Sequence, residues 1–180
     1  MPFYGPRVEY ALHTLLNLSL APGEIAPSAR DLAEFQRLSI AFMQKLLTRL
    51  EKAGLIVGAE GVRGGWHLAR PPDAITALEV ADAAQGNAPL FECRNIRARC
   101  ALWRDGAAPA TATSGVCSIH AIMLAAERAL RDELAGHTLA DIARQMQSKI
   151  SADRAAAIPR WFATRYRTRR SRDASAGGAA

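Results

Sequence analysis

Apolar residues along the first third of the chain recur at the period of an amphipathic helix, and helix-breaking or capping residues interrupt this pattern twice. Pro22 and Gly23 end the first helix, while Ser28 and Ser39 occupy the N-cap positions of the second and third. Asp31, three positions after Ser28, completes a capping box. Three helices are therefore predicted, over residues 8–20, 29–35 and 40–53.

The third predicted helix has an apolar side and a polar side. Its apolar stripe consists of Ile40, Met43, Leu47 and Leu50, and its outward side carries Ala41, Gln44, Lys45 and Thr48. Two short strands follow, over residues 55–57 and 66–68, joined by a glycine-containing loop. Helix, turn, helix and hairpin in this order are typical of a winged helix-turn-helix domain.

The second half of the chain is predicted to be helical on both sides of an irregular segment. Helices are expected over residues 75–85, 117–135 and 139–147. The helix over 117–135 has one long apolar face, which favours packing against a second copy of the chain, with packing inside one chain as the alternative. The last residues have the composition of a disordered segment.

The predicted fold class is therefore mostly α with a small β wing. A winged helix-turn-helix DNA-binding domain is expected over residues 1–72, and a Cys-containing loop with the dimerisation helix over 73–147. A basic, disordered tail is expected over 148–180.

The net charge of the 180-residue chain is +6, but it is concentrated at one end. From Pro159 onward there are six Arg and one Asp, a net charge of +5, which alone predicts only nonspecific attraction to phosphate. The length excludes a large multidomain enzyme. There is no apolar run of the roughly 20 residues that cross a bilayer and no apolar signal core at the start, so a cytoplasmic protein without membrane contact is expected.

DNA contacts are expected from the second helix of the helix-turn-helix and from the wing, since the helix enters the major groove and helix starts meet phosphate. The candidates are Ser28, Ser39, Gln44, Lys45 and Thr48, with Arg63 and Gly64 in the wing. Gln44 can bond adenine with two hydrogen bonds, whereas Lys45 suits either a base or a phosphate. A tight hairpin in any α+β domain also accounts for the wing glycines.

Three cysteines lie in the irregular segment. Cys93, Cys100 and Cys117 have spacings of seven and seventeen, which match no zinc finger or ribbon. Soft thiolates suit iron-sulfur chemistry, and three ordinary buried Cys are the alternative. Two compact pairs accompany them, each on one helix face: Glu9 with His13, and Cys117 with His120.

Taken together, these segments resemble the Rrf-type winged-helix transcriptional regulators. The resemblance rests on SIAFMQKLLTRLEKAGLI, VRGGWHLARPP and ITALEVADAAQG, followed by Cys-containing sequence and a long helix, and it spans about residues 8–144. The glycine wing followed by LARPP is its most specific element. The resemblance implies a homodimeric repressor that binds palindromic promoter DNA and senses iron-sulfur status, nitric oxide, iron or redox state, in many members through an iron-sulfur cluster.

The resemblance also implies a set of cluster ligands. The sequence VEYALH is similar to that of a redox-sensing branch, in which Glu and His of one subunit and two Cys of the other hold a 2Fe-2S cluster at the dimer interface. Glu9 and His13 match the first pair, and Cys100 and Cys117 are the expected thiolates, with Cys93 as a substitute.

Other interpretations stay open beside this one. A second branch, the regulator of iron-sulfur cluster assembly, holds its cluster with three Cys and a nearby His. In this sequence the matching residues are Cys93, Cys100, Cys117 and His120. This alternative leaves Glu9 and His13 without a role. A cluster-free winged-helix repressor could sense oxidants through its thiols or act without a ligand. An enzyme with Cys117 as nucleophile and His120 as base lacks any oxyanion-hole or substrate-pocket signature, so no enzyme is expected.

Overall fold

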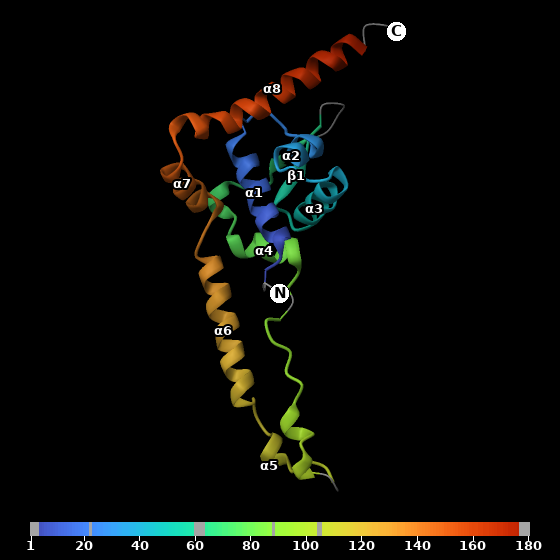
Figure 1. Cartoon of the computed structure of the whole chain (residues 1–180), viewed down its shortest axis with the longest axis vertical. Coiled ribbons are helices and arrows are strands. Elements are labelled where there is room, and N and C mark those ends of the chain that lie inside the picture. Colours follow the sequence, from blue (N-terminus) through green and yellow to red (C-terminus); the bar gives the residue numbers. More distant parts are fainter. Residues whose placement is uncertain (1–3, 22, 60–63, 88, 104–105, 177–180) are drawn as a thin grey trace. The chain divides into compact units, whose positions relative to one another are not determined.

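The computed structural model describes residues 4–21, 23–59, 64–87, 89–103 and 106–176. The chain forms two compact units, whose elements are labelled in Figure 1. Unit 1 contains Met1–Gly86 and Leu134–Ala180, and unit 2 contains Asn87–Glu133. Unit 1 thus joins the predicted winged domain to segments from both later regions of the chain. No helix among the described residues is long and apolar enough to cross a membrane.

Unit 1 is mostly helical with one small hairpin, as the sequence predicts. Its elements are α1 (Pro6–Leu20), α2 (Ala29–Phe35), α3 (Ile40–Lys52), β1 (Ile56–Gly58), β2 (Trp66–Leu68), the 3-10 turn η1 (Pro72–Ala74), α4 (Ala77–Gln85), α7 (Leu139–Lys149) and α8 (Ala152–Ala176). The order from α1 to β2 confirms the winged helix-turn-helix fold.

Helix α1 lies at the centre of this unit. Ala11 and Leu15 are completely buried, and α3, α4, β2, α7 and α8 all contact the helix. Glu9 and His13 lie on its exposed side. Because so many elements bury their apolar faces against one helix, α1 holds the core of unit 1 together.

Helices α2 and α3 begin at the predicted caps. The Ser28 side chain accepts a hydrogen bond from the Asp31 backbone N–H and the Asp31 carboxylate accepts one from the Ser28 N–H, while the Ser39 hydroxyl accepts from the Phe42 N–H. The buried residues of α3 are Met43, Leu46, Leu47 and Leu50. Ile40 was expected in this stripe but is 41% exposed, because the stripe ends one turn short of the helix N-terminus and Leu46 widens it.

The wing is an antiparallel hairpin whose base packs against the segment before α2. Ile56 pairs with Leu68 and Gly58 with Trp66. Gly65 admits no side chain, because an added Cβ would lie 2.2 Å from the Ala26 carbonyl oxygen. The close approach fixes the base of the wing against the N-terminal side of α2.

The segments that precede α4 and α7 pair with each other within unit 1. The Ala77 N–H donates to the His137 carbonyl at 2.8 Å, and the Leu139 N–H donates to the Ile75 carbonyl at 2.9 Å. Thr76 and Thr138, which face each other in this bridge, each cap the helix that follows. The starts of α4 and α7 are therefore held side by side within unit 1.

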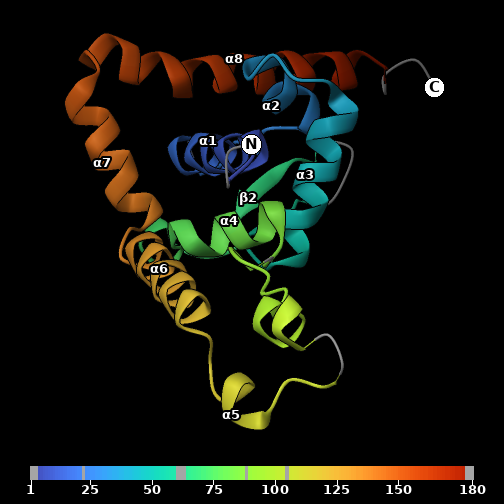
Figure 2. The same cartoon turned by 60° about the horizontal axis from the view of Figure 1, so that its bottom comes forward.

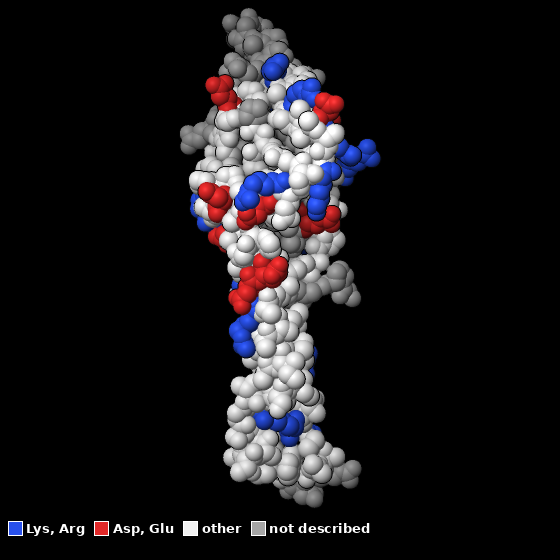
Figure 3. All heavy atoms as spheres, turned by 90° about the vertical axis from the view of Figure 1, so that its left-hand side faces the viewer, with Lys and Arg blue, Asp and Glu red and all other residues white. Residues whose placement is uncertain are grey.

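Unit 2 contains short helical turns followed by most of the long helix α6. Its elements are η2 (Ile96–Ala98), η3 (Ala101–Trp103), α5 (Ala110–Thr113) and α6 (Ser118–Ala135). The Arg97 guanidinium donates to the carbonyls of Thr113, Ser114 and Gly115, which fixes the loop leading into α6. None of the described residues of α6 is buried. Ile119 is 66% exposed and Ile122 is 68% exposed. On the face drawn in Figure 3, the surface of this unit is largely free of charged residues.

The expectation of a disordered tail is wrong for residues 152–176, which form α8. Phe162 is only 1% exposed, and its ring lies 5.0 Å from that of Phe35 on α2. Trp161 stacks edge-on against both of these rings. Figure 2 shows α8 passing along unit 1 beside α2. Trp161 and Phe162 thus give the Arg-rich helix α8 an apolar side that packs against α2.

We predict that Phe162→Ala lowers the free energy of unfolding by about 3–5 kcal/mol, because it removes a fully buried aromatic ring. Thr164→Ala on the exposed side of α8 is the matched control and should change this free energy by less than about 0.5 kcal/mol. Urea unfolding followed by circular dichroism measures both. Equal unfolding midpoints for the two variants would show that α8 does not pack on α2.

Candidate nucleic-acid interface and cysteine-containing pocket

The outward side of α3 carries the side chains expected to reach DNA. Gln44, Lys45 and Thr48 are all exposed. The Thr48 hydroxyl donates to the Gln44 carbonyl at 2.9 Å, so it is engaged with its own helix. Gln44 and Lys45 are therefore the long polar side chains that this face offers to a major groove.

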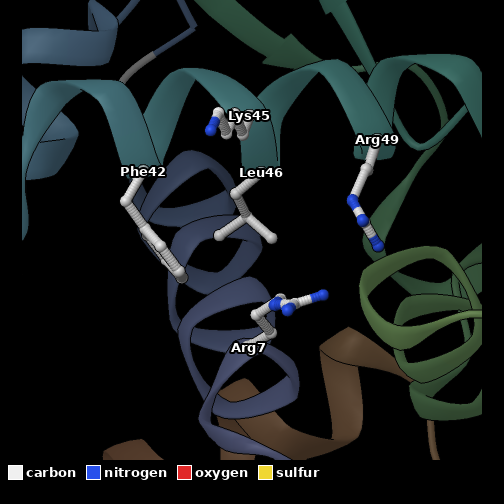
Figure 4. Close-up of a pocket in the computed structure, with 5 residues that line it drawn as sticks. All are labelled: Arg7, Phe42, Lys45, Leu46 and Arg49. Atoms are coloured by element: carbon white, nitrogen blue, oxygen red, sulfur yellow. The ribbon is translucent and has the colours of Figure 1, made fainter.

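A basic groove continues this face toward α1 and α4 (Figure 4). It has a volume of about 350 Å³ and is lined by Arg7, Phe42, Lys45, Leu46 and Arg49. Phe42 and Leu46 point from α3 toward α1, and the Arg49 guanidinium donates to the Ala84 carbonyl of α4 at 3.0 Å. Three cationic side chains around an apolar floor suit a backbone phosphate.

Sequence reasoning missed Arg7 and Arg49 in this groove. Arg49 stands four positions after Lys45, so the helix period alone could have added it to the outward face. Arg7 belongs to another helix, and only the packing of α1 against α3 brings it there.

The other residues predicted to contact DNA are the two N-cap serines and two residues of the wing. The Ser28 hydroxyl donates to the Asp31 carboxylate at 2.7 Å, and both Ser28 and Ser39 use their side chains as helix caps. Gly64 is half-buried beside β2, and Arg63 lies outside the described residues. The two serines therefore fix the helix starts, whose N–H groups face any bound phosphate.

Glu9 and His13 lie together in unit 1, as their spacing predicts. Both line a pocket of about 580 Å³ on α1, with walls formed by apolar residues that include Leu12, Leu16 and Ile142. A carboxylate and an imidazole at the rim of an apolar hollow can coordinate a metal that a partner chain helps to enclose.

A second pocket, of about 510 Å³, lies within unit 2. Cys93, Cys117 and His120 all line it, whereas Cys100 does not and has its Sγ 3.8 Å from the Arg97 carbonyl oxygen. All three cysteines are free and half-buried, rather than fully buried. Among the described residues of one chain, no group of three or more His, Cys, Asp or Glu is placed to hold a metal ion.

The Cys117 thiol lies at the start of α6, and this position lowers its pKa. The backbone N–H groups of His120 and then Ile119 donate to the sulfur and favour the thiolate, although partial burial acts in the opposite direction. The nearby charge of Arg97 lowers the pKa further. Cys117 is thus prepared to act as a thiolate ligand or a reactive thiol.

The hairpin and the exposed polar face of α3 define a winged helix-turn-helix protein of the DNA-binding class. The model of the Rrf2 family, described as iron-dependent transcriptional regulators, matches residues 5–145. The chain belongs to this family, so it is a transcriptional regulator and not an enzyme.

Known proteins agree with this assignment. The chain is 29% identical to the protein rrf2 of Nitratidesulfovibrio vulgaris over 138 residues, which cover 77% of this chain and 85% of that protein. It is 36% identical to NsrR of Shouchella clausii over 87 residues, 48% of this chain. That match covers 58% of NsrR, and the match to the Synechocystis protein slr0846 likewise covers 58% of its length.

Solved structures show the same fold. The global cysteine regulator CymR of B. subtilis has a TM-score of 0.62 at 23% identity, covering 81% of this chain and 98% of that one. IscR of T. potens has a TM-score of 0.61 at 21% identity, covering 82% of this chain and 90% of that one.

We predict that Gln44→Ala and Lys45→Ala change DNA binding in different ways. Gln44→Ala should cost about 1–3 kcal/mol of discrimination at one base pair, because it removes a base contact. Lys45→Ala should weaken binding to all duplexes and make the slope of log affinity against log salt less negative by about 0.9. Binding titrations on a duplex selected from random sequence measure both effects.

Lys52→Ala, at the exposed C-terminal end of α3, is the matched control. Its affinity and salt slope should stay at the wild-type values. Equal losses for Lys52→Ala and Lys45→Ala would mean that α3 contributes only a general positive charge.

Proposed function

We propose that this Rrf2-family regulator is a homodimer that represses transcription from a palindromic operator and senses redox, iron-sulfur or nitric oxide status through a 2Fe-2S cluster. The observation that carries the proposal is the division of the donors into two sets. Glu9 and His13 share a pocket rim in unit 1, and Cys117 with a second Cys lies in unit 2.

A cluster shared between protomers fits these donors better than a cluster within one chain. A site of three Cys and one His within one chain would leave Glu9 and His13 without a role. A shared site needs only one pair from each protomer, Glu9 and His13 from one and two thiolates from the other. The mixture of oxygen, nitrogen and sulfur donors is compatible with a 2Fe-2S cluster.

Cys117 is the first thiolate of the proposed set, because its pKa is lowered at the start of α6. Cys100 is the second expected ligand. Cys93 is the substitute, and its place in the same pocket as Cys117 supports that role. Single Cys→Ser variants decide between them.

The apolar surface of α6 supports the homodimer. Ile119, Ile122 and the preceding Val116 are all more than 60% exposed in the single chain. Large exposed apolar side chains on one helix are typical of a protein interface, and a second copy of the same helix is the simplest partner. The model of the family ends within α7, so this helix belongs to the shared part of the fold.

When bound, the cluster supplies a one-electron redox change. The chain's part is to convert a change at Glu9 and His13 into a change at the DNA surface. Both residues are on α1, and Arg7 of the same helix lines the basic groove beside Lys45. Two recognition helices must match half-sites about 34 Å apart, so a small displacement of each winged domain suffices to lose the operator.

A cluster-free thiol sensor is the second candidate, favoured by the lowered pKa of Cys117. A thiolate is the form that oxidants attack, and Cys93 in the same pocket is a neighbouring thiol for a disulfide. In this case Glu9 and His13 have no role in sensing.

We predict that anaerobically purified protein contains iron and acid-labile sulfide, at about two of each per protomer when the sites are full. Glu9→Ala and His13→Ala should lower the iron content or shift the reduction potential, because each removes a ligand, without changing dimer formation. Glu24→Ala, exposed and outside the pocket, is the matched control and should retain the cluster.

Visible absorption, iron and sulfide analysis and a redox titration measure these effects. Wild-type iron content and potential in both α1 variants would contradict the ligand assignment. Iron-free wild-type protein whose DNA affinity changes on oxidation, and no longer does so in Cys117→Ser, would support the thiol sensor instead.

A further inference from the structure

Helix α8 lies outside the segment that the family model matches. The model ends at residue 145, whereas α8 runs from Ala152 to Ala176. Phe162 is buried against Phe35 of α2, so this added helix is a fixed part of unit 1 (Figure 2). The family assignment alone gives α8 no role.

Arg169 makes two polar contacts where α8 packs beside α2. Its Nη1 atom lies 2.6 Å from the Asp31 carboxylate, and its Nη2 atom donates to the Ala26 carbonyl at 2.8 Å. The side chain of Arg169 is 24% exposed and that of Asp31 is 11% exposed, so salt screens this ion pair only weakly. A guanidinium can hold both acceptors at once, because its N–H groups form a rigid planar fork.

Both acceptors belong to the segment that starts α2. The Oδ2 atom of Asp31 that accepts from Arg169 also accepts from the N–H and the hydroxyl of Ser28 in the capping box. Ala26 precedes that cap by two residues and is 4% exposed. Arg169 therefore ties the segment before α2 to α8.

The same segment carries the wing. The Ala26 carbonyl oxygen is the atom that a Cβ on Gly65 would meet most closely, which is why no side chain fits there. The adjacent Trp66 N–H donates to the Pro27 carbonyl at 3.0 Å. A displacement of residues 26–27 would therefore move the wing relative to α3.

We propose that Arg169 is a positioning residue, which holds the wing in register with α3 and thereby sets the preference for operator over other DNA. A recognition helix and a wing contact one duplex together, so both sets of contacts are complete in only one relative placement. Both terminal nitrogens of Arg169 are engaged within unit 1. Arg169 thus acts through the wing and not on a phosphate.

This role goes beyond the proposed sensing and rests only on DNA binding by the winged domain. The cationic side chains of the basic groove, Arg7, Lys45 and Arg49, still attract any duplex when Arg169 is absent. Loss of Arg169 should therefore weaken the operator complex more than complexes with random-sequence DNA.

The test compares full-length Arg169→Ala with Arg165→Ala. The described contacts of Arg165 are an ion pair with Glu34 of α2 and the ring of Trp161, not the segment before α2. This control therefore also removes one positive charge and one ion pair between α8 and α2.

A third variant, Arg169→Lys, keeps the charge beside Asp31 but lacks the second arm of the fork for the Ala26 carbonyl. Circular dichroism verifies the fold of each variant. If Arg169→Ala does not fold, Arg169→Lys carries the same comparison with Arg165→Ala.

Hydrogen exchange at the Trp66 amide measures how firmly the wing is attached. In Arg169→Ala this amide should exchange about tenfold faster, the scale of one lost charge-assisted hydrogen bond. The Ala69 N–H, which donates to the Leu55 carbonyl at the opposite end of the hairpin, should keep its wild-type rate. Arg165→Ala should leave both rates unchanged, and Arg169→Lys should give an intermediate rate at Trp66.

Titrations with a selected operator duplex and a random-sequence duplex of equal length measure the preference. Arg169→Ala should lower the ratio of the two affinities by about tenfold, because it disturbs the contacts that only the operator completes. The slope of log affinity against log salt should stay at that of Arg165→Ala, since no phosphate contact is lost. Arg165→Ala should keep the wild-type ratio, and Arg169→Lys should fall between.

A salt slope less negative by about 0.9 in Arg169→Ala than in Arg165→Ala would overturn the inference, because Arg169 would then contact a phosphate itself. Faster exchange at Trp66 with an unchanged affinity ratio would contradict it as well. So would equal effects of the two alanine variants, since α8 would then act only through overall stability. Absence of wild-type binding to every duplex would instead refute DNA binding itself, and this role with it.

Discussion

Apolar packing around α1 is the interaction on which the rest of unit 1 depends. The recognition helix, the wing strand β2, α4 and both C-terminal helices all contact this one helix. Its residues Ala11 and Leu15 are inaccessible to solvent, so the contacts are dense on its buried side. A close-packed interior transmits displacement, so a movement of α1 is passed on to the recognition helix α3 and the wing strand β2, which both contact it.

This arrangement connects the two surfaces of α1 that stay exposed. Arg7 faces the basic groove beside Lys45, and Glu9 and His13 lie at the rim of the apolar pocket. A helix is stiff over so short a distance, because its backbone hydrogen bonds link each turn to the next. Under the proposed function, ligation at the pocket rim and phosphate binding at the groove are thus coupled through a single rigid element.

Most of the winged domain follows from local sequence signals. The capping box of Ser28 with Asp31 starts α2 where the sequence predicts it, because the box is completed within four residues. Thr138 with Asp141 starts α7 in the same way. Helix α8 could not be predicted in this way. Its composition is that of a solvated arm, and the partner that buries Phe162 is Phe35, far away in the sequence.

Some residues of the candidate site can likewise be predicted from local sequence, whereas others are brought there only by packing between distant segments. The helix period places Glu9 beside His13 and Gln44 beside Thr48, since residues four apart share a helix face. Arg7 enters the basic groove only through packing between helices. A cluster shared between protomers cannot be derived from one chain's spacing, because half of its ligands belong to the partner.

The contact of α1 with α8 has a consequence for how the protein is made. Unit 2 separates the two parts of unit 1 in sequence. The contact between α1 and α8 of unit 1 therefore closes a loop that spans most of the chain. Contacts between distant residues form late, because the chain must first lose the entropy of that loop. During synthesis, Phe35 emerges from the ribosome long before Phe162 and stays uncovered until α8 is made. Unit 1 is therefore completed only after the inserted unit 2 has been synthesised, although the helix-turn-helix elements α2 and α3 are made early.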